Sequence, residues 1–181
     1  MLHRAGPFLP PITFPWADGP RIVVSEEFRR ELQGAGFQGL RYGPAVKARI
    51  IKLSWHEWDR TAAEPKRYPP GGEPEGYIWD KPHDARVAAG MPEAWELLPP
   101  LVPLRMERLE ALRGGYLDKF RGYLSETHYP AVFLSRHEYG NLVVDDVARE
   151  WFETRAGKWV RFCEVELSDE EHGAAPAPVG K

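Results

Sequence analysis

Hydrophobic and polar positions in the first quarter of the chain predict a strand followed by a helix. Residues 22–24 form a short β-branched run after a Gly-Pro pair, which is typical of a buried strand. Ser25 and the two glutamates after it predict the start of a helix, and Phe28 and Leu32 fall on one face of that helix. We expect the helix to end at the glycine-containing stretch 34–36.

Two strands are then expected to form a hairpin. The apolar positions in residues 37–44 predict a returning strand that ends at a Gly-Pro pair. Residues 45–55 follow at once, and their alternation of apolar and basic positions predicts a half-buried strand. The short link between the two segments favours antiparallel pairing.

The middle of the chain gives weaker signals. Residues 60–103 are rich in proline and glycine and predict an irregular insertion, which contains a short helix starting at Pro92 with Trp95 and Leu98 turned inward. Residues 104–124 carry apolar side chains at steps of three and four, which predicts a longer helix.

The last third of the chain returns to the first pattern. Short strands are predicted at 131–134 and 141–144, Asp145 is placed to cap the next helix, and 158–167 predicts a closing strand. The acidic and then Ala/Pro-rich stretch 168–181 predicts a disordered tail. We therefore expect a single α+β domain over 1–167.

The two strand-helix-strand units, about 21–43 and 141–167, match each other when the chain is shifted by 120 residues. The matched pairs include Ile22 with Leu142, Val24 with Val144, Ser25 with Asp145, Arg29 with Arg149 and Leu32 with Phe152. Two interpretations remain: a duplicated unit, or a chance coincidence of a common pattern. In either case the units are expected to surround a mixed or antiparallel sheet.

Composition narrows the class of protein. The 181 residues include 43% hydrophobic side chains, and 27 acidic against 24 basic residues give a formal charge of -3. This balance is that of a globular domain, and without a basic block it argues against a nucleic-acid partner. We find no signal peptide and no stretch of about 20 apolar residues, so we expect a cytoplasmic protein without a membrane partner.

Cysteine and histidine positions give little sign of catalysis or metal binding. The single Cys163 excludes an internal disulfide and every multi-cysteine zinc pattern, and strand alternation predicts a buried or half-buried thiol there. His56 lies beside Glu57 and Asp59, so a small enzyme of unknown type is an alternative. No second histidine follows at the spacing that a metal helix uses. We expect no catalytic residue, no metal and no cofactor.

Aromatic side chains next to charges predict a surface that binds a partner. Trp58, Tyr77 and Trp79 fall in loops beside acidic residues, a setting typical of interface hot spots, although they would equally serve to pin the long connection to the sheet. Carboxylates that would accompany them on a binding surface facing a basic partner include those of Glu57, Asp59, Glu73, Glu75, Asp80 and Asp84.

The run Ile22–Arg29, followed by Gly36–Tyr42, resembles the "V-V-S-E-x-F … G-x-x-G-L-x-F" ending of bacterial polymorphic-toxin immunity proteins, in particular the myxobacterial double-CXXCG immunity family and related immunity families. The resemblance covers about a quarter of the chain and lacks the CXXCG motifs, because the chain has one cysteine. It implies a protein that neutralises a cognate toxin by tight binding without turnover. A self-assembling structural protein is the third class that we keep open.

Overall fold

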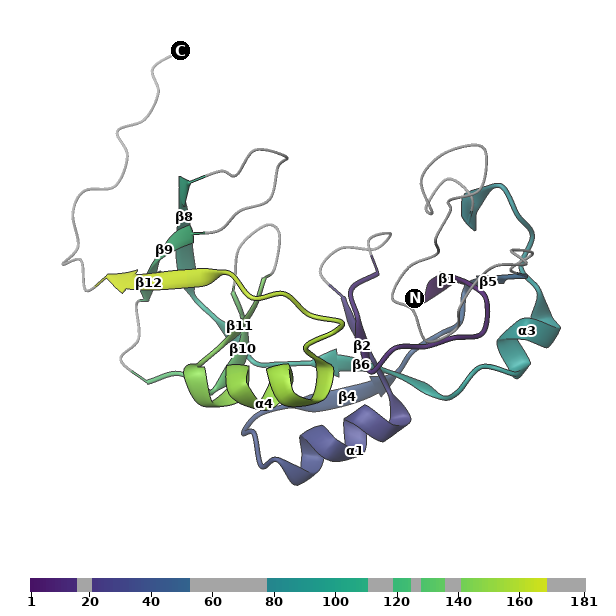
Figure 1. The fold of residues 1–181 in the computed structure, drawn as a ribbon, viewed down its shortest axis with the longest axis horizontal. Helices are drawn as coiled ribbons and strands as arrows, with labels where there is room; N and C mark the ends of the chain where they lie inside the picture. Colours follow the sequence, from purple (N-terminus) through teal and green to yellow (C-terminus); the bar gives the residue numbers. More distant parts are fainter. Residues whose placement is uncertain (16–20, 53–77, 111–118, 125–127, 136–140, 169–181) are drawn as a thin grey trace, which may run out of the picture.

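The structure is a computed structural model, and it describes residues 1–15, 21–52, 78–110, 119–124, 128–135 and 141–168. Helices and mixed or antiparallel sheets are both present, so the expected α+β class is confirmed. Figure 1 shows the two longer helices lying next to each other across the strands of the central region.

The first unit is a four-stranded antiparallel sheet with a helix on one face. Its strand order is β2-β3-β6-β4, which places β6 between β3 and β4. The elements of this unit are β2 (Ile12–Thr13), β3 (Ile22–Ser25), α1 (Glu26–Gly34), β4 (Arg41–Pro44) and β6 (Ala94–Leu98).

Helix α1 starts and packs as its sequence predicts. The Ser25 hydroxyl accepts a hydrogen bond from the Phe28 amide at 3.2 Å, which satisfies one of the amides left open at a helix start. Phe28 and Leu32 are 2% and 0% exposed, and they join the buried face of β3 in one core. The helix therefore exists because its cap and its apolar stripe agree.

The second unit repeats the antiparallel strand pair and the capped helix of the first, in a mixed three-stranded sheet. β10 (Val132–Ser135) and β11 (Leu142–Val144) form an antiparallel hairpin, and β7 (Leu101–Val102) runs parallel to β10. Helix α4 (Asp146–Ala156) follows, and the Asp145 carboxylate accepts from the Ala148 amide at 2.7 Å.

Aromatic rings join the two helices. The centroid of Phe28 on α1 lies 5.5 Å from that of Trp151 and 5.9 Å from that of Phe152 on α4. Phe37, just beyond α1, completes the cluster, with its centroid 5.4 Å from that of Trp151. These spacings are those of favourable edge-to-face and tilted ring pairs. The cluster puts both units around one shared core.

Two further sheets flank this core. β1 (His3–Ala5) pairs in parallel with β5 (Arg49–Ile51). β9 (Lys119–Leu124) lies between β8 (Leu104–Glu110) and β12 (Glu164–Ser168) in the other sheet. In Figure 1 these two sheets occupy opposite ends of the molecule, with the paired helices between them.

The prediction of two helices in the middle of the chain is wrong. The segment around Trp95 is strand β6, in which Leu98 is 38% exposed, and the stretch 104–124 begins and ends as strands β8 and β9. Leu and Glu favour helices only weakly, by a few tenths of a kcal/mol per residue. In β6 that preference is overridden by pairing with strands on both sides.

Three strand predictions also need correction. The strand near 45–55 does not form a hairpin with β4, because β5 pairs with β1, and Ile50 and Ile51 are both buried instead of alternating. The closing strand begins only at Glu164. Ser168 ends that strand, so it belongs to the sheet and not to the tail.

The predicted irregular segment 60–103 is described from residue 78 onward. That part contains α3 (Ala85–Ala89) together with β6 and β7. Residues 60–77 and the predicted tail beyond 168 lie outside the described residues.

Glu26, in the first turn of α1, forms a charged network with two arginines. Its carboxylate accepts from Arg29 at 2.7 and 2.9 Å and from Arg30 at 2.7 Å. These hydrogen bonds, chiefly the one from Arg29, lower the pKa of Glu26 from 4.5 to about 2. The Arg29 guanidinium also lies 4.4 Å from the Trp95 ring centroid, so the network fixes α1 over β6.

We predict that Phe152→Ala lowers the free energy of unfolding by about 3–5 kcal/mol, because it removes a ring that is 1% exposed and touches both helices. Val147→Ala on the same helix, at a side chain 73% exposed, should change it by less than about 0.5 kcal/mol. Denaturant unfolding of both variants measures the difference, and equal effects would contradict the shared core.

We also predict that the Glu26 carboxyl titrates near pH 2 in the folded protein, because its pKa is lowered to about 2. A lowered folded-state pKa means that this contribution to stability is complete above pH 4.5 and is lost as the pH falls toward 2. Carboxyl titration by NMR checks this, and Arg29→Gln should raise the midpoint. A midpoint near 4.5 in the unmodified chain would show that the network does not hold.

Candidate functional site

The predicted binding residues fall into two groups. Trp79, Asp80 and Asp84 lie in a described segment between β5 and α3. The other four predicted residues, Glu57, Trp58, Asp59 and Tyr77, lie outside the described residues, as does His56 of the alternative enzyme site.

Trp79 is an exposed aromatic side chain held from two sides. It is 51% exposed, and the His3 ring from β1 lies 5.0 Å from it, centroid to centroid. The Arg49 guanidinium from β5 lies 5.2 Å from the Trp79 ring and donates a hydrogen bond to the Trp79 carbonyl at 2.7 Å. The indole is therefore restrained while half of its surface stays open to a partner.

The residues after Trp79 are attached to the edge of β5. The Ile50 amide donates to Nδ1 of His83 at 3.0 Å, and the Asp84 amide donates to the Ile50 carbonyl at 2.7 Å. This geometry uses the Nδ1 lone pair and assigns the ring proton of neutral His83 to Nε2. The imidazole is a structural acceptor here, since it replaces a backbone carbonyl at the strand edge.

The side chain of Asp84 stabilises the start of helix α3. Its carboxylate caps α3 by accepting from the amides of Arg86 and Val87 at 2.9 and 3.0 Å. The hydrogen bond from the Val87 amide is the largest cause that lowers the pKa of Asp84. An acid that is ionised and committed to two amides is poorly placed for general acid-base chemistry.

A shallow hollow of about 570 Å³ lies next to these residues. It is lined by Lys52, Lys81, Pro82, His83, Asp84, Ala85 and Arg86. We call Trp79 together with this hollow the tryptophan surface. Within the described residues 49–52 and 78–86 the basic side chains outnumber the acidic ones by four to two, so this described part of the surface has net positive charge. The four basic side chains are Arg49, Lys52, Lys81 and Arg86.

Cys163 is exposed, which corrects the expectation of a buried or half-buried thiol. The expectation assumed a strand through residue 163, whereas β12 begins at the next residue. Across the described ranges no three His, Cys, Asp or Glu side chains are grouped to hold a metal ion.

The sequence identified Trp79 but not its supports. His3 and Arg49 lie 76 and 30 positions away from Trp79 along the chain. The parallel pairing of β1 with β5 places His3 and Arg49 at directly opposed positions. No local sequence pattern predicts a pairing between strands this far apart in the chain.

None of the helices that the structure describes is long and apolar enough to cross a bilayer. Comparisons of the chain with protein-family models, with curated proteins and with solved structures found no match. The site must therefore be interpreted from its own geometry.

We predict that Asp84→Ala loosens the start of α3, because the amides of Arg86 and Val87 lose their common acceptor. Amide hydrogen exchange at Val87 should become several-fold faster, while Asp84→Asn should keep most of the protection. Asp80→Ala, at an exposed neighbour that is not the cap of α3, is the matched control. Equal exchange in the two alanine variants would disprove the capping role.

Proposed function

We propose that the protein is an immunity protein that neutralises a cognate bacterial toxin by direct binding, without catalysis, in the cytoplasm. The resemblance of residues 22–29 and 36–42 to immunity proteins suggests the toxin as partner. The observation that carries a binding function is the restrained and half-exposed Trp79 on a charged surface.

An anchor of this kind suits protein recognition. Tryptophan and arginine are the residue types most often found to dominate interface energies. Trp79 loses little conformational freedom on binding because Arg49 and His3 already restrain it. Its surroundings are polar and charged, as at the rim of an interface that forms between separately folded proteins.

The polar side chains of the tryptophan surface support contact better than turnover. His83 accepts from the Ile50 amide, and the Asp84 carboxylate caps α3, so neither is held ready to move a proton. The enzyme alternative rests on His56, Glu57 and Asp59, which lie outside the described residues.

The charge of the surface indicates the partner's complementary face. Arg49, Lys52, Lys81 and Arg86 favour an acidic patch on the toxin, which would speed association at low ionic strength. The basic toxin face that the carboxylates suggest stays an alternative, because Glu57 and Asp59 lie outside the described residues.

The test is binding to the toxin domain encoded beside this chain, measured by co-purification and calorimetry. Trp79→Ala should weaken binding by at least about tenfold, the usual loss at a hot spot. Leu167→Ala is the matched control, because Leu167 is 50% exposed on β12, at the opposite end of the molecule in Figure 1.

Full affinity in the Trp79→Ala variant would remove the tryptophan surface from the interface. Failure of the unmodified chain to bind or neutralise any neighbouring toxin domain would contradict the immunity function itself.

A further inference from the structure

The two units match in hydrogen-bond register as well as in sequence. Ile12 pairs with Val24 in the first hairpin, and Val132 pairs with Val144 in the second, each shifted by 120 positions. The backbone amides of the two capping residues also make equivalent hydrogen bonds. That of Ser25 donates to the Pro11 carbonyl at 3.0 Å, and that of Asp145 donates to the Ala131 carbonyl at 2.9 Å. These last four residues also correspond at the same shift.

Side-chain contacts on the helices repeat as well. Arg29 bonds to Glu26 and also to Gln33, at 3.1 Å. Its counterpart Arg149 lies 3.5 Å from Asp146 and 3.3 Å from Glu153, again at a shift of 120. Agreement of strand pairing, cap and helix contacts favours a duplicated unit over a chance coincidence.

The units differ at one strand edge. In the first unit β6 runs antiparallel along β3, with Leu97 opposite Ile22 and Trp95 opposite Val24. The Glu26 amide extends this contact by donating to the Glu93 carbonyl at 3.2 Å. In the second unit, β11 pairs with β10 on one side and with no other strand of the described chain.

Backbone geometry shows which groups this edge presents. The Asp145 amide points to β10, so in an antiparallel ladder the backbone groups of Val143 also face β10. Those of Leu142 and Val144 then face away from β10, as those of Ile22 and Val24 face β6 in the first unit.

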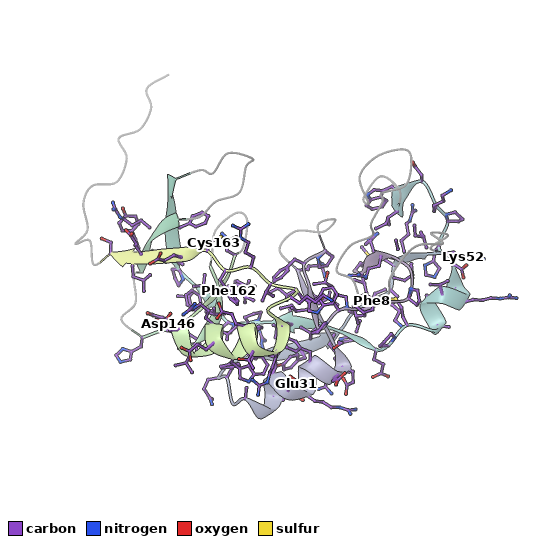
Figure 2. The ribbon with its side chains drawn as sticks, viewed as in Figure 1. Phe8, Glu31, Lys52, Asp146, Phe162 and Cys163 are labelled. Carbon is purple, nitrogen blue, oxygen red and sulfur yellow. The ribbon has the colours of Figure 1, made fainter. Side chains whose placement is uncertain are left out.

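Side chains on β11 are more exposed than their counterparts on β3, as expected if the second unit lacks a strand beside β11. Ile22 and Val24 are 2% and 0% exposed, while Leu142 and Val144 are only partly buried. The Arg29 side chain is 19% exposed beneath its contact with Trp95, whereas Arg149 is 43% exposed. Figure 2 labels Asp146 at the start of α4, close to the end of β11.

β4 corresponds to residues 161–164, of which 161–163 form no strand. Figure 2 labels Phe162 and Cys163 on this segment, above α4. In the first unit the order is β3, β6, β4, whereas in the second unit no strand of the described chain lies beside β11 in the place that β6 takes.

We propose that the outer edge of β11 binds an extended segment of a partner protein as an added antiparallel strand, in the place that β6 takes in the first unit. Backbone hydrogen bonds to Leu142 and Val144 would supply affinity, as in other cases of strand addition. β6 also predicts the side chains of that segment: an aromatic residue opposite Val144, stacked on Arg149, and an aliphatic residue opposite Leu142. The proposal needs neither Trp79 nor a toxin as partner.

The probe is a synthetic peptide with the sequence of residues 92–99, added to the full chain. Amide exchange measured by NMR should slow at Leu142 and Val144 by at least about tenfold when the peptide saturates the protein. Val143, already bonded to β10, and Val24, already bonded to β6, serve as internal controls. A peptide N-methylated at the position of Trp95 should have no effect, since it lacks the amide that meets the carbonyl of Val144.

Three results would overturn the proposal. Leu142 and Val144 amides that are already protected in the free, monomeric chain would mean that the edge is covered. Equal protection by the N-methylated peptide would exclude strand pairing. Protection that rises with protein concentration alone, together with a dimer in ultracentrifugation, would assign the edge to a second copy of this chain.

Discussion

The structure depends on the aromatic contact between its two longer helices. Phe28 and Phe37 from the first unit meet Trp151 and Phe152 from the second, and the ion pair of Arg155 with Glu31 spans the same junction at 3.5 Å. Neither unit buries its helix face without the other, because both faces belong to one core. This core positions the edge of β11, whereas the sheet beside Trp79 packs on a separate hydrophobic cluster that includes Leu2, Ile50 and Met91.

Local signals in the sequence were enough to predict the capped helices of the two units. Ser25 and Asp145 begin their helices as predicted, because a capping oxygen and an apolar stripe act within one turn. The middle of the chain was misread, since β6 owes its extended form to ladders with β3 and β4, whose partner residues lie more than 50 positions away. Trp79 was identifiable from its neighbours, whereas the supports from His3 and Arg49 follow from the parallel pairing of β1 with β5.

The two candidate surfaces would bind a partner through different kinds of interaction. The tryptophan surface offers one restrained ring among mostly basic side chains, so its affinity would depend on apolar burial and on charge. The edge of β11 offers backbone groups in a fixed register, so its affinity would depend on hydrogen bonds and on the shape of two alternate side chains. A partner that used both surfaces would gain from their attachment to one chain, because the second contact would form at a high effective concentration.

Native-state hydrogen exchange on the two helices tests the central claim most directly. If one core joins the units, the buried amides of α1 around Phe28 and Leu32 and those of α4 around Phe152 should open with the same free energy, through one cooperative event. Exchange of the α4 amides through an opening of much lower free energy, while the α1 amides remain protected, would contradict the account. It would mean that the second unit unfolds without disturbing the first.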